Sequence, residues 1–406
     1  MRFAGQFRAP GHRRSVGVLG SVCNMTRTLR LNPLGVDVEL TFEESISAEF
    51  EADLRESWAD VSGEPGEAEP DETHRLSLAP LDEPEVSDVV GGSAADLASQ
   101  LSTIVTLDAI EHNGGRLVMI HAAGIALDDG RVIAFVGPSG RGKTTLARSL
   151  GREYGYVTDE TLAVDFDGNV LPYRKPLSVI VDPSEPKAQL SPAKLGLRPL
   201  PDAPLRIAAI VLLHRVEEHE LEGGPQLSPV ATGSAIGWMV PELSYLPALP
   251  DPLVQLAELI DSTDGVRRVT YSEASQVVDL VPEILSSHGD VQPWTSGHSE
   301  PDATTPSATV GEDSYRRAAG VHWLLFANEA VTLESRMVRQ LAGIAPGLWE
   351  LLGEWTTLTQ LTAELMEQYG EVADARQLVQ VALDGLLEAN LVERVQAAVV
   401  GTSAVR

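Results

Sequence analysis

One stretch near the middle of the chain constrains its fold more than any other. It reads Val132-Ile-Ala-Phe-Val-Gly-Pro-Ser-Gly-Arg-Gly-Lys-Thr-Thr-Leu146 and contains the pattern G-x-x-x-x-G-K-[ST] directly after a run of apolar residues. The pattern requires a buried strand, a glycine-rich turn and a helix in this order, because the backbone N–H groups of the turn and the helix N-terminus must face one anion. An accidental turn is the structural alternative. The segment predicts an α/β domain with a phosphate-binding loop.

The loop residues have distinct expected tasks. Glycines let the backbone approach a phosphate, Lys143 adds a point charge between the β- and γ-phosphates, and the Thr144 hydroxyl can ligate Mg²⁺. We therefore expect the domain to bind ATP and Mg²⁺. The predicted nucleotide-binding residues are Gly137, Pro138, Ser139, Gly140, Arg141, Gly142, Lys143, Thr144 and Thr145.

Two neighbouring segments carry titratable side chains. Asp159 and Glu160 follow the short apolar run that begins at Gly155, and acids at a strand end beside a phosphate loop can hold Mg²⁺ or accept a proton. A turn acid is the structural alternative. His121 closes the apolar run that starts at Leu117. A lone histidine is more often structural, so the residues alone leave its role open.

Short runs rich in β-branched residues alternate with turn signals through this region, which predicts a mixed sheet. The residues after the loop place Leu146, Ala147 and Leu150 on one face of a helix. The predicted strands are Leu117 to His121, Val132 to Val136, Leu162 to Phe166 and Ile207 to Leu213.

Charge and cysteine content exclude several classes of protein. The net charge of −29 argues against binding to nucleic acid through phosphate neutralisation. The single cysteine, Cys23, excludes an internal disulfide framework and a cysteine-built zinc site, and it indicates a reducing, cytoplasmic location. The most notable uncharged apolar run is too short to cross a membrane, so we expect no membrane partner.

Composition divides the 406 residues into several parts. Residues 1–36 carry six arginines and no acid but no apolar core of a secretory signal, so a disordered arm or an over-extended start before Met25 is expected. Residues 36–90 carry eighteen acids and two arginines, which predicts a solvated acidic loop. The predicted parts are a basic arm (1–24), the P-loop domain (25–286, with an acidic insertion at about 43–90), a flexible linker (287–314), a second domain (315–395) and a tail (396–406).

The second domain has the element order hairpin, three helices, strand, which predicts a small winged-helix-like α+β module. Thr357 can cap the second helix, and Trp349 is expected in the core. A DNA-binding winged helix is disfavoured, because residues 315–406 hold seven arginines against eleven acids. The predicted elements are a hairpin (322–326 and 330–333), helices (348–352, 358–369 and 375–389) and a strand (391–395).

From about Leu117 to Leu213 the chain resembles the catalytic domain of HPr-kinase-like proteins, the P-loop kinases that phosphorylate a serine on a protein acceptor. The resemblance rests on Ile120-His121-Ala-Ala-Gly, on the loop, and on Gly155-Tyr-Val-Thr-Asp159-Glu160. It implies that Asp159 is the general base, that His121 and Lys143 assist catalysis, and that Thr144, Asp159 and Glu160 hold the metal. Glu160 stands where the family usually has Asp, and the phosphorolysis signature of the family is not found.

Further stretches resemble a divergent branch of that family. Val170-Leu-Pro-Tyr-Arg174-Lys175-Pro-Leu looks like a stretch of kinases similar to HPr kinase that occur beside peptide-modification genes, and Val266 to Ser272 resembles their closing strand. The loop also looks like that of transporter ATPases. Neither the LSGGQ-type signature nor the late Asp-Glu strand of those proteins is found.

The C-terminal domain resembles PqqD, the small chaperone that captures the leader of a precursor peptide for modification enzymes. The likeness rests on Pro346-Gly-Leu-Trp349-Glu-Leu-Leu, on the stretch from Thr357 to Leu365, and on Leu386-Leu-Glu-Ala-Asn-Leu-Val. It implies a leader peptide as partner, with peptide-modifying enzymes as further partners. The sequence thus predicts an ATP-dependent Ser/Thr peptide kinase in the biosynthesis of a ribosomally made, modified peptide. A non-catalytic, nucleotide-gated peptide chaperone is the alternative.

Overall fold

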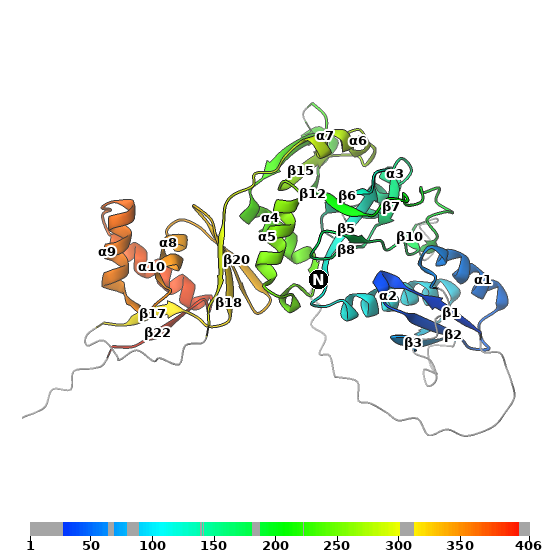
Figure 1. Cartoon of the computed structure of the whole chain (residues 1–406), viewed down its shortest axis with the longest axis horizontal. Coiled ribbons are helices and arrows are strands. Elements are labelled where there is room, and N and C mark those ends of the chain that lie inside the picture. The colour runs from blue at the N-terminus through cyan, green and yellow to red at the C-terminus, as the bar shows by residue number, and fades with distance from the viewer. Residues whose placement is uncertain are drawn as a thin grey trace, which may run out of the picture.

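The computed structural model describes residues 27–63, 69–78, 89–138, 140, 142–180, 187–221, 223–300 and 312–397. Three units follow one another along the long axis of the molecule (Figure 1). We call them the N-terminal unit (27–112), the P-loop unit (118–286) and the C-terminal unit (295–397). The predicted arm at 1–24 and residues 398–406 of the predicted tail lie outside the described residues.

A nine-stranded mixed sheet forms the P-loop unit, which confirms the predicted α/β class. The strand order is β13-β15-β12-β6-β5-β8-β9, and β7 and β14 also pair with β5. The strands are β5 (Val118–Ala126), β6 (Arg131–Val136), β7 (Gly155–Thr158), β8 (Thr161–Val164), β9 (Val170–Leu171), β12 (Arg206–Arg215), β13 (Gln226–Val230), β14 (Leu243–Ser244) and β15 (Val266–Tyr271). A separate ribbon pairs β10 (Leu177–Val179) with β11 (Ala188–Leu190).

Helices cover both faces of this sheet because its central strands are apolar on both sides. In β6, Val132, Ala134 and Val136 belong to the core beneath α4 and α5. Ile133 and Phe135 belong to the opposite core, under α3, α6 and α7. The helices are α3 (Lys143–Leu150), α4 (Thr232–Met239), α5 (Pro252–Ser262), α6 (Ser275–Val278) and α7 (Val281–Ser286), with 3₁₀ turns η3 (Glu218–Glu220), η4 (Val240–Glu242) and η5 (Leu246–Ala248).

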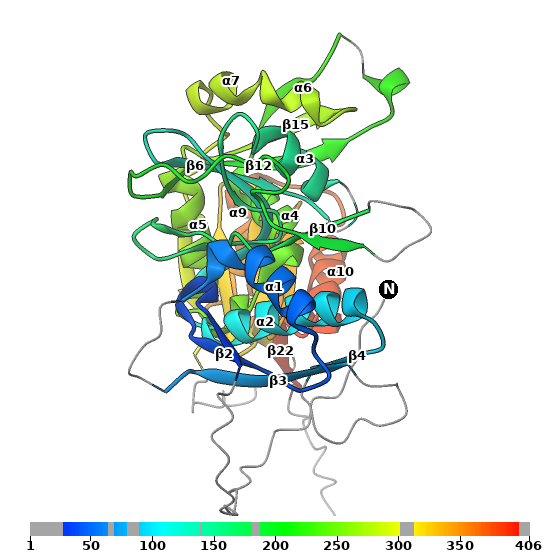
Figure 2. The same cartoon turned by 90° about the vertical axis from the view of Figure 1, so that its right-hand side faces the viewer.

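The N-terminal unit corrects the prediction of a solvated acidic loop. Its sheet has the order β1-β2-β3-β4, and α1 and α2 lie on one side of it (Figure 2). The acidic stretch contributes α1 and β3, because Leu54, Trp58 and Leu76 are buried, whereas none of the described acids of the stretch is buried. Residues 64–68 and 79–88 of the stretch lie outside the described part. The elements are β1 (Thr28–Leu31), η1 (Pro33–Gly35), β2 (Val38–Phe42), α1 (Ala48–Ser57), η2 (Ala59–Val61), β3 (Glu72–Leu78), β4 (Val89–Gly91) and α2 (Ala94–His112).

The C-terminal unit has the hairpin, the three helices and the final strand that the sequence predicts. Thr357 accepts a hydrogen bond from the Gln360 backbone in a capping box, and Trp349 is fully buried. Two sheets flank the helices, with orders β16-β18-β19-β20 and β21-β17-β22. The elements are β16 (Thr295–His298), β17 (Ser314–Arg317), β18 (Val321–Leu325), β19 (Ala330–Glu334), β20 (Met337–Leu341), α8 (Ala345–Leu351), β21 (Thr356–Thr357), α9 (Leu358–Tyr369), α10 (Ala375–Glu388) and β22 (Val392–Val395).

Part of the predicted linker is a strand of the C-terminal sheet. β16 pairs antiparallel with β18, and Gly297 lies under the Trp323 ring, where a Cβ would come within 2.3 Å of a ring carbon. The Trp294 indole N–H also donates to the Asp261 carboxylate at 3.0 Å. Residues 301–311 of the predicted linker are outside the described residues. A glycine under an aromatic ring gives no apolar alternation, so the sequence pattern did not indicate this strand.

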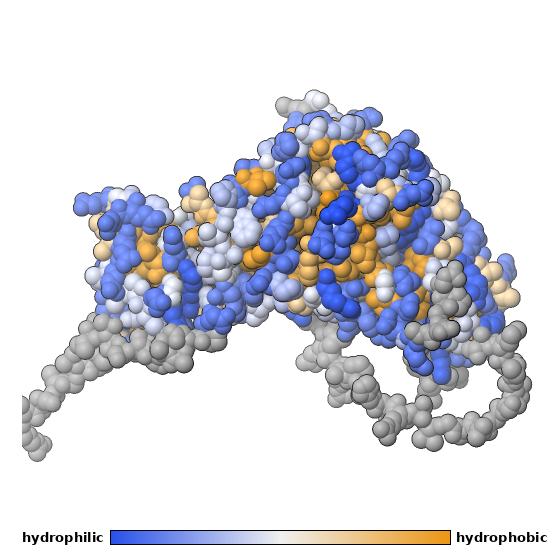
Figure 3. Space-filling model, viewed as in Figure 1, coloured by the Kyte–Doolittle hydropathy of each residue, from blue (hydrophilic) through white to orange (hydrophobic). Residues whose placement is uncertain are grey.

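The C-terminal sheet packs directly on the P-loop unit. Leu324, Phe326, Val331 and Leu333 belong to the same core cluster as α4 and α5. On the face seen in Figure 3, hydrophobic residues gather mainly over the middle of the molecule, where the P-loop unit lies. Among the residues described, no helix combines the length and apolar character needed to span a bilayer.

Candidate phosphate-binding site

The predicted strand, loop and helix are formed by β6 and α3. Gly140 and Gly142 have φ angles of 79° and 92°, a region that favours glycine. Gly142 is the N-cap of α3, and its carbonyl accepts the first helical hydrogen bond, from Leu146 N at 2.9 Å. Ser139 and Arg141 lie outside the described residues. The backbone N–H groups at the start of α3 are therefore free of intrahelical partners, as an anion site requires.

Lys143 lies at the mouth of this loop. Its side chain is buried, and Nζ donates a hydrogen bond to the carbonyl oxygen of Gly137. Burial lowers the pKa of Lys143, while the carboxylates of Glu242, Glu160 and Asp159 oppose this shift. A cation thus stands where the sequence predicts a contact to the β- and γ-phosphates.

Asp159 follows β7 and is held by a buried tyrosine. It is buried, and its Oδ1 accepts a hydrogen bond from the Tyr156 hydroxyl at 3.0 Å. Complete burial raises the pKa of Tyr156 well above its ordinary value, so this phenol stays a donor. The hydrogen bond fixes one carboxylate oxygen of Asp159 and leaves the other for a ligand.

His121 lies on β5, opposite Thr161 of β8. Its Nδ1 is 2.9 Å from the carbonyl oxygen of Glu160 and must donate to it. Burial and then the positive charge of Lys143 lower the pKa of His121. A neutral ring that donates through Nδ1 presents an unprotonated Nε2, so His121 is placed to accept a hydrogen bond.

Glu160 forms an ion pair that the sequence did not indicate. Its Oε2 lies 2.8 Å from Lys175 Nζ, and the Lys175 side chain is only 4% exposed. Burial acts to lower the pKa of Lys175, but the charges of Glu160 and Asp159 and the hydrogen bond to Glu160 together outweigh burial, and the net shift is upward. Lys175 is therefore a permanent buried cation beside the loop.

The stretch around Lys175 fixes β7, the strand that directly precedes Asp159. Arg174 donates to the carbonyl oxygens of Tyr156 and Arg198, and it pairs with Asp60 of η2 at 3.0 Å. These contacts connect β7 to the N-terminal unit.

A second contact to the N-terminal unit is made by Tyr173, which is buried and whose hydroxyl lies 2.8 Å from the hydroxyl of Thr106 in α2. Because the Thr106 hydroxyl donates its proton to the Ser102 carbonyl oxygen, Tyr173 is the donor in this hydrogen bond. In the sequence, the stretch from Val170 to Leu177 was noted only for its resemblance to other kinases, and no role was predicted for Tyr156 or Arg174.

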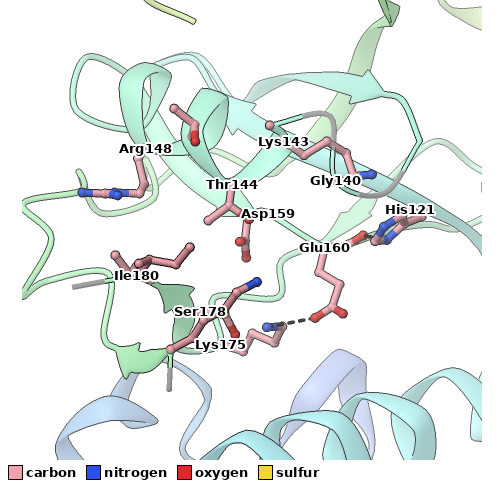
Figure 4. A pocket seen from close by; sticks show the side chains of 14 residues that line it. His121, Gly140, Lys143, Thr144, Arg148, Asp159, Glu160, Lys175, Ser178 and Ile180 are labelled. Atoms are coloured by element: carbon pink, nitrogen blue, oxygen red, sulfur yellow. Dashed lines mark hydrogen bonds and ion pairs between the residues drawn. The ribbon is translucent and has the colours of Figure 1, made fainter. Parts of the chain in front are cut away.

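One cavity of about 610 Å³ unites these groups (Figure 4). Its lining combines the described loop and α3 residues Gly140, Gly142, Lys143, Thr144 and Thr145 with His121, Asp159 and Glu160. Gly137 and Pro138 line a different, neighbouring cavity.

Positive charge is concentrated at the 610 Å³ cavity. Three of the four lysines in the chain line it, namely Lys143, Lys175 and Lys187. Arg148 lines it too, and its Nε is buried without a hydrogen-bond partner among the described residues. In a chain with a net charge of −29, this clustering of cations fits an anionic ligand.

The oxygen donors that could hold a metal are few. Thr144, Asp159 and Glu160 line the cavity together, but no group of three or more His, Cys, Asp or Glu side chains among the described residues could hold an ion alone. Mg²⁺ commonly takes one or two carboxylates and completes its shell with water and substrate phosphates. The donor set therefore fits Mg²⁺ only together with a nucleotide.

Comparisons with known proteins add little to this geometry. No family model matches the chain, and no curated protein matches its sequence. The structure is similar to that of the HPr(Ser) kinase/phosphatase from Coxiella burnetii, with 12% identity and a TM-score of 0.24 over 41% of this chain and 93% of that chain. A TM-score this low does not establish a shared fold.

Proposed function

We propose that the protein is an ATP-dependent kinase of the HPr-kinase-like type that phosphorylates a Ser or Thr hydroxyl of a peptide or protein. The observation that supports this proposal best is the convergence of Lys143, Asp159 and His121 on one cation-rich cavity at the start of α3. A phosphate loop alone would serve any nucleotide-binding protein. A buried carboxylate beside it adds a proton acceptor, which phosphoryl transfer to a hydroxyl can use.

The residues divide the work as follows. The N-terminal amides of α3 and Lys143 stabilise negative charge on the phosphates. Asp159, oriented by Tyr156, takes the proton of the acceptor hydroxyl, and His121 accepts a hydrogen bond through Nε2. Mg²⁺, held by Thr144 with Asp159 or Glu160, would supply neutralisation of charge on the β- and γ-phosphates. Lys175 keeps the Glu160 carboxylate in place.

We further propose that the C-terminal unit, which resembles PqqD, recruits a precursor peptide during biosynthesis of a ribosomally made, modified peptide. Within the described residues, β18 and β19 are both paired on two sides, and β20 pairs only with β19. The free edge of β20 is thus an available place for an added peptide strand. Because Leu324 and Val331 belong to the core of the P-loop unit, deleting the C-terminal unit would expose that core.

The test is transfer from γ-labelled ATP to a degenerate library of Ser- and Thr-containing peptides by the full-length protein. Asp159→Asn should retain ATP affinity and lose transfer by about 10² to 10⁴-fold, the usual contribution of a positioned base. Lys143→Ala should weaken both binding and transfer. Asp167→Asn, an exposed acid in the turn after β8, is the matched control and should change neither. Wild-type transfer by Asp159→Asn would refute the mechanism, and ATP binding without any transfer would favour the nucleotide-gated chaperone.

A further inference from the structure

A second cavity lies against the first residues of the phosphate loop. It measures about 460 Å³, and we call it the Trp238 pocket. Gly137 and Pro138 form one wall, Trp238 and Glu242 form another, and Gln340 of β20 closes it. The pocket is therefore shared between the phosphate loop, the end of α4 and the C-terminal unit. No step of the mechanism described above uses it.

Glu242 reaches this pocket through a short strand pairing. Leu243 of β14 pairs with Ile120 of β5 in antiparallel register, which brings the segment that contains Glu242 against the strand that carries His121. Among the charged groups that act on Lys143, Glu242 has the largest effect. Lys143 and Glu242 both lie near Gly137, because Lys143 Nζ donates to the Gly137 carbonyl oxygen and Glu242 lines the same pocket as Gly137. Glu242 is half-buried, and this burial raises the pKa of its carboxyl group.

The rest of the pocket fits a peptide segment better than a second nucleotide. Its wall is apolar apart from Glu242 and Gln340, and the Trp238 ring is 57% exposed with Arg268 stacked on it at 5.3 Å. Gln340 anchors β20 to α4 through a 2.8 Å hydrogen bond to Gly233 O. Since Gln340 belongs to β20 and lines the pocket together with Gly137 and Pro138, a chain paired with the free edge of β20 would lie close to the pocket.

We propose that the acceptor peptide enters through the Trp238 pocket and that Glu242 faces the γ-phosphate and orients the acceptor hydroxyl. This inference rests on the proposed kinase function. The acceptor oxygen forms a bond to the γ-phosphorus, the bond from that phosphorus to the β–γ bridging oxygen breaks, and ADP leaves. The hydroxyl proton passes to Asp159. Glu242 contacts the acceptor, and its negative charge opposes that of the γ-phosphate.

The first experiment compares ATP with ADP, because only ATP carries the γ-phosphate. Glu242→Gln removes a like charge, so binding of ATP by the full-length protein should tighten about three- to tenfold, whereas ADP should change less than about twofold. Glu258→Gln, an exposed glutamate on α5, is the matched control and should alter neither affinity. Equal effects on ATP and ADP, or no effect on either, would overturn the placement of Glu242.

The second experiment follows the acceptor. With the Ser and Thr peptide library, Trp238→Ala should raise the peptide KM at least about fivefold and leave ATP affinity and melting temperature unchanged, because its ring is mostly exposed. Glu242→Gln should lower kcat while ATP binds more tightly. An unchanged peptide KM and kcat in a protein that does transfer phosphate would refute the acceptor pocket and leave the kinase proposal standing. If the wild-type protein transfers phosphate to no peptide, the kinase proposal and the acceptor role fail together, and the ATP-to-ADP comparison still decides where Glu242 lies.

Discussion

The buried ion pair between Glu160 and Lys175 gives the sharpest test of the site's energetics. Its two members differ in burial: the Lys175 side chain is 4% exposed, whereas that of Glu160 is 39% exposed. Removing the exposed partner leaves an unpaired buried cation, and removing the buried partner leaves a carboxylate that water can reach. The two single substitutions should therefore have unequal effects on the free energy of unfolding.

The magnitudes follow from the partners that remain. After Glu160→Ala, the acceptors left to Lys175 Nζ among the described residues are the Pro176 carbonyl at 3.3 Å and the Ser102 hydroxyl at 3.4 Å. The carboxylate of Asp159 remains as a nearby opposite charge. We expect a loss of about 3 kcal/mol, the lower end for breaking a buried pair. Lys175→Met fills the same space without a charge and should cost about 1 kcal/mol or less, because Glu160 can be hydrated. The double variant should resemble Lys175→Met alone, which gives a coupling energy of about 3 kcal/mol.

Urea unfolding of the four proteins measures these differences. The pair between Lys194 and Glu56 is a matched control, since its atoms are also 2.8 Å apart but its side chains are 43% and 56% exposed. Replacing either control residue with alanine should have no measurable effect. If Lys175→Met destabilises the protein as much as Glu160→Ala, or if the control pair behaves like the buried pair, burial does not govern the energetics of this pair.

Two further predictions concern His121 and β16. Because the pKa of His121 is lowered in the folded protein, the unfolded chain binds more protons, so stability is full above about pH 6.5 and is lost as pH falls toward the folded pKa. His121→Gln should flatten the dependence of the melting temperature on pH between roughly 5 and 7, and an unchanged slope would contradict the shift. Gly297→Val places a Cβ against the Trp323 ring, so amide exchange at residues 295–298 should speed up by at least about tenfold. Gly370→Val, at the C-cap of α9 with open space around its Cβ position, should not affect those amides, although its positive φ will cost stability.

Structural features that depend on a few neighbouring residues could be predicted from the sequence alone. The loop pattern predicted β6 and α3, the apolar face of Leu146 and Leu150 is buried, and the Thr357 cap is formed. Each depends on residues within one or two helical turns. The sequence also named His121, Lys143 and Asp159, which lie around one cavity, although their catalytic roles stay predictions.

The residues that the sequence did not indicate reach the site through long-range pairing. Glu242 arrives because β14 pairs with β5, and Lys175 arrives because its stretch folds back onto Glu160. Neither pairing has a local signal, since a two-residue strand and a buried lysine look like loop residues in a sequence. The prediction for the acidic stretch was wrong for a different reason. It rested on the net charge of the stretch and gave no weight to apolar side chains that are buried in the core, namely Leu54, Trp58 and Leu76.

The way the C-terminal unit is attached changes how recruitment would work. A flexible tether would hold a captured peptide at a high local concentration without fixing its path. Here the sheet packs on α4 and α5, and Gly233 and Gly237 bring α4 close to Glu329 and Gln340. A strand advances about 3.3 Å per residue, so a peptide paired with the five residues of β20 spans about 16 Å and ends near Gln340. Under the proposed recruitment, acceptor hydroxyls within a few residues of the captured segment would reach the phosphate loop directly, whereas more distant ones would have to loop out at an entropic cost.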